Sequence, residues 1–422
     1  MSKRRNKVCG ADVHRDLIVA TIRDDDNLLF QNEFGTTHAE LKRFRDWLVV
    51  NNCEQVAFEA TGVYWLPIYD FLSPYIDTIV ANPWKIKNIP KDKTDSKDSQ
   101  WIASLCLNGQ IKRSRILSKN ERDLRTMTRA RSGYVKTRTQ FRNRIHKYLA
   151  SNGIKLSSCI SDIFGESGRY ILGGLVEGWS IDTILDGIPS GRVRKKRDLI
   201  KAAIGSGLDE ISRMLIKDTM DLLGHLETKV EAASQEVINK LQTKSKDLAI
   251  VMSIPGIGFV SGSVILAEIG DYHDFKTPEQ LAKWCGLSPG ENESAGKKRP
   301  CGITKQGSKY LRTMLVQIAH VVARKSNTKL SRFFQRLSKR KEYNVAITAL
   351  ARKLICLVYH LLINQELYQE EDCERRKSKP AKSDPTSSYS PEDQLEDKVA
   401  AIVDAFYHLK ANGRKRSSDG SG

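Results

Sequence analysis

The chain has 422 residues, of which 40% are hydrophobic and 28% charged, so it is long enough for two or more folding units with a sizeable core. Its formal charge of +19 and pI near 9.5 predict a polyanionic partner, most often nucleic acid. The basic N-terminus lacks the apolar stretch of a signal peptide, and no apolar run approaches the roughly 20 residues that cross a bilayer. We therefore expect a cytoplasmic protein with no membrane contact. The eight scattered cysteines have no C-x-x-C spacing, which argues against a zinc ribbon and fits a reducing compartment.

The first 115 residues alternate between strand and helix patterns. Two strands are predicted within residues 7–22, a third after the turn at 24–27, and others at 55–58 and 78–80. Helices are predicted over 38–50 and 63–73, and a further helix begins after an N-cap at Thr94 and ends at Gly109. This order predicts an α/β domain over residues 1–115, with a mixed sheet of the ribonuclease H-like kind.

Four carboxylates stand out by their position in this domain. Asp12 follows the first strand, Glu59 ends a later strand, and Asp95 and Asp98 are three residues apart at the start of a helix, where they share one face. Two divalent ions about 4 Å apart need such a cluster of hard oxygen ligands to catalyse in-line phosphoryl transfer. Taken singly, each residue has a plainer explanation as a turn residue, a helix cap or a surface acid.

Residues 116–245 have a helical, basic pattern. A long helix is predicted over 119–150, and no acidic residue lies between Leu124 and Ser161. With no acid in the segment to pair with them, its basic residues predict a helix that lies against nucleic acid, although such a run is often only a solvated face. The residues expected to make this contact are Arg125, Arg129, Arg138 and Arg142. Residues 153–190 are expected to be irregular, and 192–197 form a second basic cluster.

A second long helix is predicted over 208–242. Its apolar residues step by fours and sevens, which is typical of a coiled-coil seam and predicts pairing with another helix or protomer, hence at least a dimer. The seam residues are Ile211, Leu215, Leu222, Leu226, Val230, Val237 and Leu241.

Residues 246–368 form a mainly helical C-terminal domain. The turn SIPGIG, with Gly256 and Gly258, has the form of a helix-hairpin-helix whose amides can hold a phosphate, or of a plain tight helix turn. A polar loop follows and holds Ser294, Lys297, Lys298, Arg299 and Lys305, with Arg312 just beyond it; helices are expected over 308–324 and 343–368. Residues 369–422 are expected to be a disordered tail with a short helix near 392–411.

Five segments together, GADVHRD, FEATGVYW, NPWKIKNIPKDKTDSKDSQWIA, IPGIG and GLSPGENESAGKKRPCGITKQGSKYLR, resemble the bacterial insertion-sequence "one-ten" family of transposases. The resemblance runs in order over residues 7–325 and is specific as a set. It implies a RuvC-like DEDD domain followed by a helical coiled-coil segment and a C-terminal transposase domain. It also implies that the DEDD set is Asp12, Glu59, Asp95 and Asp98.

The resemblance further implies that Ser294 is a nucleophile that forms a covalent phosphoserine with DNA. A bare serine hydroxyl needs activation, which Mg²⁺, as one or two ions with Mn²⁺ as a substitute, would supply. Lys297, Lys298, Arg299 and Lys305 would hold the phosphate. The family is guided by an element-encoded bridge RNA, so the implied partners are DNA, this RNA and further copies of the chain in a dimer or tetramer.

Two other functions remain open on the residues. A metal-dependent nuclease of the Holliday-junction-resolvase kind would use the four carboxylates with water and would not need Ser294. A non-catalytic nucleic-acid-binding protein would need none of these five residues. A tyrosine recombinase is disfavoured, because Tyr310 and Tyr343 lack the accompanying Arg/His constellation.

Overall fold

The computed structural model divides into two compact units, residues 1–116 and 117–422. It describes residues 6–25, 29–60, 62–82, 95–290, 293–294, 297–298, 302–325 and 328–370, without the side chains of 29, 95, 96, 293, 294, 297 and 298. The predicted tail beyond residue 370 lies outside these ranges.

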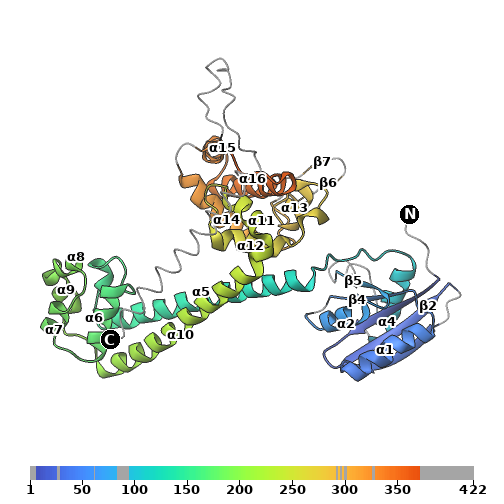
Figure 1. Cartoon of the computed structure of the whole chain (residues 1–422), viewed down its shortest axis with the longest axis horizontal. Coiled ribbons are helices and arrows are strands. Elements are labelled where there is room, and N and C mark those ends of the chain that lie inside the picture. The colour runs from blue at the N-terminus through green and yellow to red at the C-terminus, as the bar shows by residue number, and fades with distance from the viewer. Residues whose placement is uncertain are drawn as a thin grey trace, which may run out of the picture. The chain divides into compact units, whose positions relative to one another are not determined.

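The first unit is built on a five-stranded mixed sheet with the order β3-β2-β1-β4-β5 (Figure 1). β1, β2 and β3 are antiparallel neighbours, whereas β4 runs parallel to both β1 and β5. This arrangement confirms the predicted mixed α/β layer. The strands are β1 (Lys7–Val13), β2 (Leu17–Asp24), β3 (Leu29–Gly35), β4 (Gln55–Glu59) and β5 (Asp77–Ala81).

Helices cover both faces of this sheet. On one face, α1 (His38–Val50) and α2 (Trp65–Leu72) pack through residues such as Phe44 and Ile68 against alternate strand residues, among them Phe58. On the other face, α4 (Asp95–Leu107) packs through Ile102 against the intervening strand residues. The period-2 alternation of strand side chains therefore assigns each strand residue to one of two cores.

The second unit contains a long antiparallel helix pair, α5 (Lys119–Ser151) and α10 (Glu210–Leu241), which lie side by side in Figure 1. Their direction follows from two contacts: Asn152, after α5, donates to the Ser212 hydroxyl at the start of α10 (2.8 Å), and Lys244, after α10, lies 3.4 Å from Glu121 at the start of α5. The helix that α10 pairs with thus belongs to the same chain.

The buried stripe of α10 differs from the predicted seam. Val230, Val237 and Leu241 are buried as predicted, but Ile211 is 68% exposed and Leu222 is 48% exposed. A neighbouring stripe is buried instead in the first half of the helix, at Ser212, Ile216, Thr219 and Leu223. The prediction was wrong there because apolar spacing alone does not distinguish two adjacent stripes, one facing α5 and one facing solvent.

Residues 153–190, which follow α5, were predicted to be irregular, and this was wrong. The segment between α5 and α10 folds into short helices around a buried core that includes Ile171, Leu172 and Ile184. Several of these helices stop within a few residues, which leaves too few turns for a recognisable periodicity. They are η1 (Leu156–Ser158), α6 (Glu166–Val176), α7 (Ile181–Asp186), α8 (Gly191–Arg194) and α9 (Arg197–Ile204).

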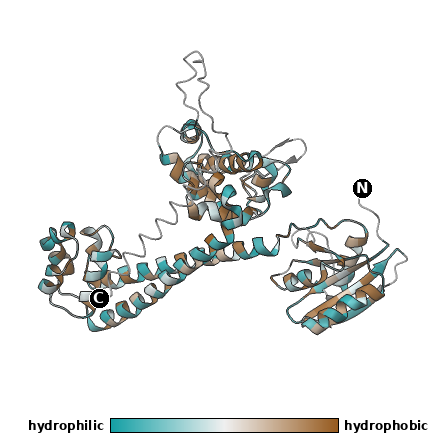
Figure 2. Ribbon diagram, in the orientation of Figure 1, coloured by the Kyte–Doolittle hydropathy of each residue, from teal (hydrophilic) through white to brown (hydrophobic). Residues whose placement is uncertain are grey.

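The C-terminal part packs helices around α16 (Tyr343–Asn364). Among the described residues, α16 is long and apolar enough to cross a membrane, but it has the burial of a core helix, with Leu350, Leu354 and Val358 fully enclosed. Figure 2 shows the hydrophobic residues gathered on α16 and the longer hydrophilic stretches on α5. The surrounding elements are η2 (Gln242–Lys244), α11 (Ser245–Met252), α12 (Phe259–Ile269), η3 (Tyr272–Asp274), α13 (Pro278–Trp284), β6 (Glu293–Ser294), β7 (Lys297–Lys298), α14 (Lys309–Arg324) and α15 (Lys329–Ser338).

Candidate catalytic carboxylates and serine loop

Asp12 and Glu59 lie at the carboxyl ends of two neighbouring parallel strands. The β1–β4 ladder pairs Ala11 with Phe58, and Asp12 and Glu59 are the next residues on their strands. Strand residues an even number of positions earlier pack against α4. Since side chains alternate between the two faces, Asp12 and Glu59 both belong to the face of the sheet that α4 covers, and both are half-buried.

The direction of α4 brings its first turn toward the same edge. Cys106, near the end of α4, lies with its Sγ 3.2 Å from Gln55 Oε1 at the start of β4. Ser99, nearer the beginning, shares a 2.7 Å hydrogen bond with Thr21, which pairs with the middle of β1. α4 therefore runs antiparallel to β1, and the turn before Ser99 points toward the carboxyl ends of β1 and β4.

Gly10 allows α4 to lie this close to β1. A Cβ atom at Gly10 would overlap the backbone nitrogen of Ala103 and the backbone oxygen of Ser99. Any larger residue would have to lift the helix off the sheet. The close contact between Gly10 and α4 sets the distance of the first turn of α4 from the sheet. It therefore positions the half-buried Asp98 and the start of the helix at Asp95, whose side chain is outside the described set.

His14 is a neighbour of this edge that the sequence analysis did not single out. Its Nε2 lies 3.1 Å from Oδ2 of Asp12. The sequence contains a signal for this contact. His14 comes two residues after Asp12 at the end of a strand, so the two side chains are expected on the same face of the sheet. The imidazole gives Asp12 a polar partner in the protein.

The donor chemistry of this edge fits a divalent cation. Asp12, Glu59 and Asp98 supply the hard carboxylate oxygens that Mg²⁺ prefers, and Asp95 would add a fourth group. Among the described side chains, which exclude Asp95, no three His, Cys, Asp or Glu residues are close enough to form a ready-made metal site. Joint metal ligation by the four carboxylates thus stays a prediction.

The loop that carries Ser294 has its two stems held together. Pro289 and Ile303 form an antiparallel bridge, and the Gly290 N–H donates to the Gly302 carbonyl over 2.8 Å. Inside the loop, β6 and β7 pair Ser294 with Lys297. Ser294 therefore stands beside the turn of a small hairpin. The side chains of Ser294, Lys297 and Lys298, and all of Arg299, lie outside the described residues.

The end of this loop is anchored by its backbone. Lys305 has a positive φ of 54°, and Gly307 has a φ of 98° at a position where a Cβ would overlap the Trp284 carbonyl. The Arg312 guanidinium donates to the carbonyls of Lys305 (3.0 Å) and Cys285 (3.4 Å). Arg312, predicted to contact nucleic acid, thus has a structural task; its contact with nucleic acid stays a prediction.

The basic helix α5 has carboxylate partners from distant segments, so the assumption that its arginines lack acids to pair with is wrong. Arg129 forms a bidentate pair with the fully buried Glu268 of α12, at 2.7 and 2.9 Å, and Arg125 lies 3.5 Å from the same carboxylate. Arg142 lies 3.1 Å from Glu227 of α10. Nucleic-acid contact by these residues, and by the half-buried Arg138, stays a prediction.

Glu268 joins three segments and was missed in the sequence, where it appears as one acid within an apolar helix. Besides the two arginines, it accepts a hydrogen bond from the Ser308 hydroxyl over 2.8 Å. Ser308 is the N-cap of α14 and directly follows the serine loop. Glu268 therefore ties the start of α5 to the end of that loop.

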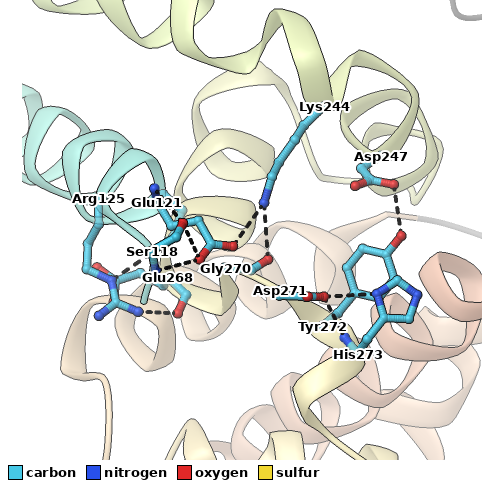
Figure 3. A network of polar contacts seen from close by, with 11 residues as sticks. Ser118, Glu121, Arg125, Lys244, Asp247, Glu268, Gly270, Asp271, Tyr272 and His273 are labelled. Atoms are coloured by element: carbon cyan, nitrogen blue, oxygen red, sulfur yellow. Dashed lines mark hydrogen bonds and ion pairs between the residues drawn. The ribbon is translucent and has the colours of Figure 1, made fainter. Parts of the chain in front are cut away.

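Figure 3 shows the polar contacts around the start of α5. Arg125 donates to the Glu268 carbonyl over 2.7 Å, and Lys244 bridges Glu121 and the Gly270 carbonyl, each at 3.4 Å. Burial alone raises the pKa of Glu121, but hydrogen bonds from Ser118 and the charge of Lys244 outweigh it and hold that pKa below its ordinary value. The network fixes α5 to the C-terminal helices.

The SIPGIG turn joins α11 to α12. Gly256 has a φ of 98°, and a Cβ there would press on the side chain of Val322 in α14. The Gly258 N–H already donates to the Ser261 hydroxyl over 3.0 Å. Packing and turn geometry thus account for Gly256, and one of the amides that were expected to hold phosphate has a protein partner; phosphate binding here stays a prediction.

Two models of protein families match this chain, one in its N-terminal part and one in its C-terminal part. Residues 9–152 match the DEDD-type model described as "Transposase" for IS110 elements, and residues 248–335 match the model "Transposase IS116/IS110/IS902 family". The DEDD match implies a RuvC-like fold, which the five-stranded mixed sheet fits, and indicates use of a divalent metal.

Curated relatives agree with these matches. A probable family 20 transposase of Pseudomonas aeruginosa is 27% identical over 74% of this chain and 85% of its own length. The transposase of insertion sequence element IS1111A from Coxiella burnetii is 25% identical over 71% of this chain and 75% of its own. A pilin gene-inverting protein of Moraxella bovis is 26% identical over 40% of this chain and 54% of its own. The chain belongs to the IS110/IS116 family of transposases and is an enzyme that recombines DNA.

Proposed function

We propose that this transposase cleaves and exchanges DNA strands through a covalent phosphoserine at Ser294, with Mg²⁺ held by Asp12, Glu59, Asp95 and Asp98. The Ser294 Oγ attacks the phosphorus of a DNA phosphodiester, a Ser–O–P bond forms, and the bond from phosphorus to one deoxyribose oxygen breaks. The Ser294 proton leaves with the displaced oxygen or passes to a nearby base. Attack by a second DNA end reverses the step and releases the serine.

The observation that carries this proposal is the edge formed by β1, β4 and the start of α4. Asp12 and Glu59 share one face at the carboxyl ends of parallel strands, where open α/β folds place their chemistry. Bound there, one or two Mg²⁺ ions, or Mn²⁺ in their place, would stabilise charge on the attacking and leaving oxygens. The carboxylates would hold the cation at this edge of the sheet.

The anchored serine loop supports the nucleophile. A hydroxyl that attacks phosphorus must be held in position, and the bridged stems at Pro289 and Ile303 limit how far the hairpin can move. Lys297, Lys298, Arg299 and Lys305 are the residues we expect to bind the phosphate oxygens. Gly256, in the turn before α12, would contribute its backbone N–H group at a second phosphate, whereas the Gly258 N–H already donates to the Ser261 hydroxyl.

We further propose that the enzyme works as a homo-oligomer, a dimer or tetramer. Strand exchange joins two DNA molecules and needs more than one nucleophile. The exposed apolar residues Ile211, Met214 and Leu222 on α10 form a strip that a second copy can cover. Such an assembly would let the carboxylates of one copy act with Ser294 of another.

A guide RNA is proposed as the source of sequence specificity. The chain carries a formal charge of +19, but no base-reading motif was found in its sequence. Base pairing between an element-encoded RNA and DNA would recognise the DNA sequence, while the protein contacts the nucleic-acid backbones, as in RNA-guided systems.

Arg138 on α5 is one residue that we expect to contact a phosphate of such a backbone. The enzyme would act in the bacterial cytoplasm, where the element resides.

The test uses the full-length protein with DNA carrying the element ends and the transcribed flanking RNA. Ser294→Ala should abolish strand cleavage and the covalent protein–DNA adduct on a denaturing gel, and Ser331→Ala, a buried serine elsewhere in this unit, controls for loss of a hydroxyl. Cleavage by Ser294→Ala at the wild-type rate, without an adduct, would favour the metal-dependent nuclease that uses water.

A further inference from the structure

The chain is rich in positive charge from the serine loop onward. Between Ser294 and Lys341 the sequence contains no acidic residue, while Lys and Arg recur throughout. The charge is densest in and around α15, a helix that the sequence analysis did not predict. The residues that share one face of this helix and its end, which we name the α15 basic face, are Lys329, Arg332, Arg336, Lys339 and Arg340.

The geometry of α15 separates this face from the protein core. Its members follow each other at helical spacing, so they lie along one side of the helix. Leu330 and Phe334 are buried on the other side and pack in the core around α16. Arg336, Lys339 and Arg340 are exposed.

Two arginines of α5 have carboxylate partners. Arg129 is held by Glu268, and Arg142 by Glu227. By contrast, Arg336, Lys339 and Arg340 form no ion pair with any carboxylate in the described part of the chain. Like charges three and four residues apart on a helix repel one another, so this surface is suited to an external polyanion.

The helix dipole does not account for the whole face. Positive charge is favourable in the last turn, which explains Arg336 and Lys339. Lys329 begins the helix and Arg332 lies in its first turn, where the dipole disfavours positive charge. A row of cations that continues into the unfavourable end of a helix indicates a requirement other than helix stability.

The length of the row matches a DNA backbone. From Lys329 to Arg340, a rise of about 1.5 Å per residue gives about 16 Å. Phosphates of one strand of B-DNA advance by about 3.4 Å each along the axis. The face therefore spans about five phosphates, as many as it has cationic side chains.

We propose that the α15 basic face binds the phosphate backbone of duplex DNA. This face lies beyond α14, whose 16 residues separate it from the end of the serine loop. The inference deepens the proposed function, because it assigns a DNA contact beyond the reacting phosphodiester. It rests on DNA being the substrate and does not depend on Ser294 being the nucleophile.

The experiment measures binding of full-length protein to a 30-base-pair duplex of arbitrary sequence as salt is raised. The test protein carries Arg336→Gln, Lys339→Gln and Arg340→Gln. Each lost phosphate contact should make the slope of log K against log salt shallower by about 0.9. For the three substitutions together we expect a slope that is shallower by roughly two to three. We also expect the affinity for the duplex at low salt to fall by on the order of tenfold or more.

The matched control removes the same charge from residues that have acidic partners: Arg197→Gln, Lys201→Gln and Lys217→Gln. It should leave the slope near that of the wild type. Equal slopes for the test and wild-type proteins, or equal losses in test and control, would overturn the proposal. A loss seen with RNA but not with duplex DNA would overturn it as well.

Two further variants separate binding from folding. Arg336→Lys with Arg340→Lys keeps the charge and should retain the wild-type slope. If the triple variant melts at a lower temperature than the control, Arg336→Gln alone should still make the slope shallower by about 0.9, and an unchanged slope in that single variant would contradict the assignment. Ser294→Ala should bind this duplex like the wild type, so loss of cleavage and loss of binding stay distinguishable.

Discussion

The guanidinium of Arg129 in α5 and the carboxylate of Glu268 in α12 form a buried bidentate ion pair, although the two residues are 139 positions apart in the chain. Glu268 has no exposed surface, and Ser308 completes its contacts. A carboxylate enclosed in this way is tolerated only with its partners in place, because an unpaired buried charge is strongly destabilising. The pair therefore ties the basic helix to the end of the serine loop.

Replacing Arg129 with Ala should lower the free energy of unfolding of the second unit by about 3 kcal/mol, the lower end for removing one partner of a buried pair. The lower end applies because Arg125, 3.5 Å away, remains near the carboxylate. Denaturant titration of full-length protein measures the change. Lys217→Ala, which breaks an exposed pair with Glu177, is the control and should cost less than about 1 kcal/mol. Equal costs for the two variants would show that the buried pair has no special weight.

The α5–α10 pair should lose stability in acid through Glu227. Burial alone raises the pKa of Glu227, but Arg169 and Arg142 outweigh it and hold that pKa below its ordinary value of 4.5. A lowered carboxylate pKa contributes stability that is fully present above about pH 4.5 and is lost as the pH falls through the folded-state value. The melting temperature of Glu227→Gln should thus lie below that of the wild type at neutral pH.

The difference between these two proteins should shrink as the pH falls below about 4.5. Glu231→Gln removes one negative charge from the same helix and controls for the change in net charge. A difference between wild type and Glu227→Gln that stays constant from pH 7 down to pH 3 would refute this role for the ion pairs with Arg142 and Arg169.

Gly10→Ala should separate α4 from β1. The new Cβ would overlap backbone atoms of Ser99 and Ala103, which cannot rotate away. We expect the free energy of unfolding of the first unit to fall by at least roughly 1–3 kcal/mol, the range seen for overpacked cores, and we expect cleavage to be lost. Gly133→Ala in α5, where the space around the position is open, should instead stabilise its helix by up to about 1 kcal/mol. A wild-type melting curve for Gly10→Ala would contradict the close approach of α4.

Divalent metal binding should depend on the carboxylates and not on the serine. In full-length protein without DNA, Mn²⁺ bound per chain, measured by electron paramagnetic resonance, should fall at least several-fold in Asp12→Asn and in Glu59→Gln. Asp46→Asn, an exposed acid of the same unit, is the matched control, and Ser294→Ala should bind as the wild type does. Unchanged Mn²⁺ binding in both carboxylate variants would remove the proposed metal site.

Local patterns in the sequence predicted much of the first unit. Glu59 ends β4 as expected, because a short apolar run followed by a Thr-Gly turn marks a strand end. The face on which Asp12, Glu59 and the start of α4 meet required the strand register and the direction of α4. Neither follows from a single segment, since both depend on contacts such as that between Ser99 and Thr21.

The second unit shows where sequence patterns fail. The arginines of α5 seemed to have no partners because Glu268 and Glu227 are distant in the chain and meet them only after folding. The short helices between α5 and α10 lack the length for a clear period. The ten residues of α15 did carry a readable signal, since Leu330, Phe334 and Leu337 recur at helical spacing.

The most direct test of the central claim is the chemical identity of the protein–DNA link. The full-length enzyme would be incubated with element-end DNA, its flanking transcript and Mg²⁺, digested with protease and nuclease, and analysed by mass spectrometry. The account predicts a nucleotide attached to Ser294, absent in Ser294→Ala and reduced at least a hundredfold in Asp12→Asn, by analogy with the loss of a strong catalytic group. Strand cleavage without any attached nucleotide, or attachment at a residue other than Ser294, would contradict it.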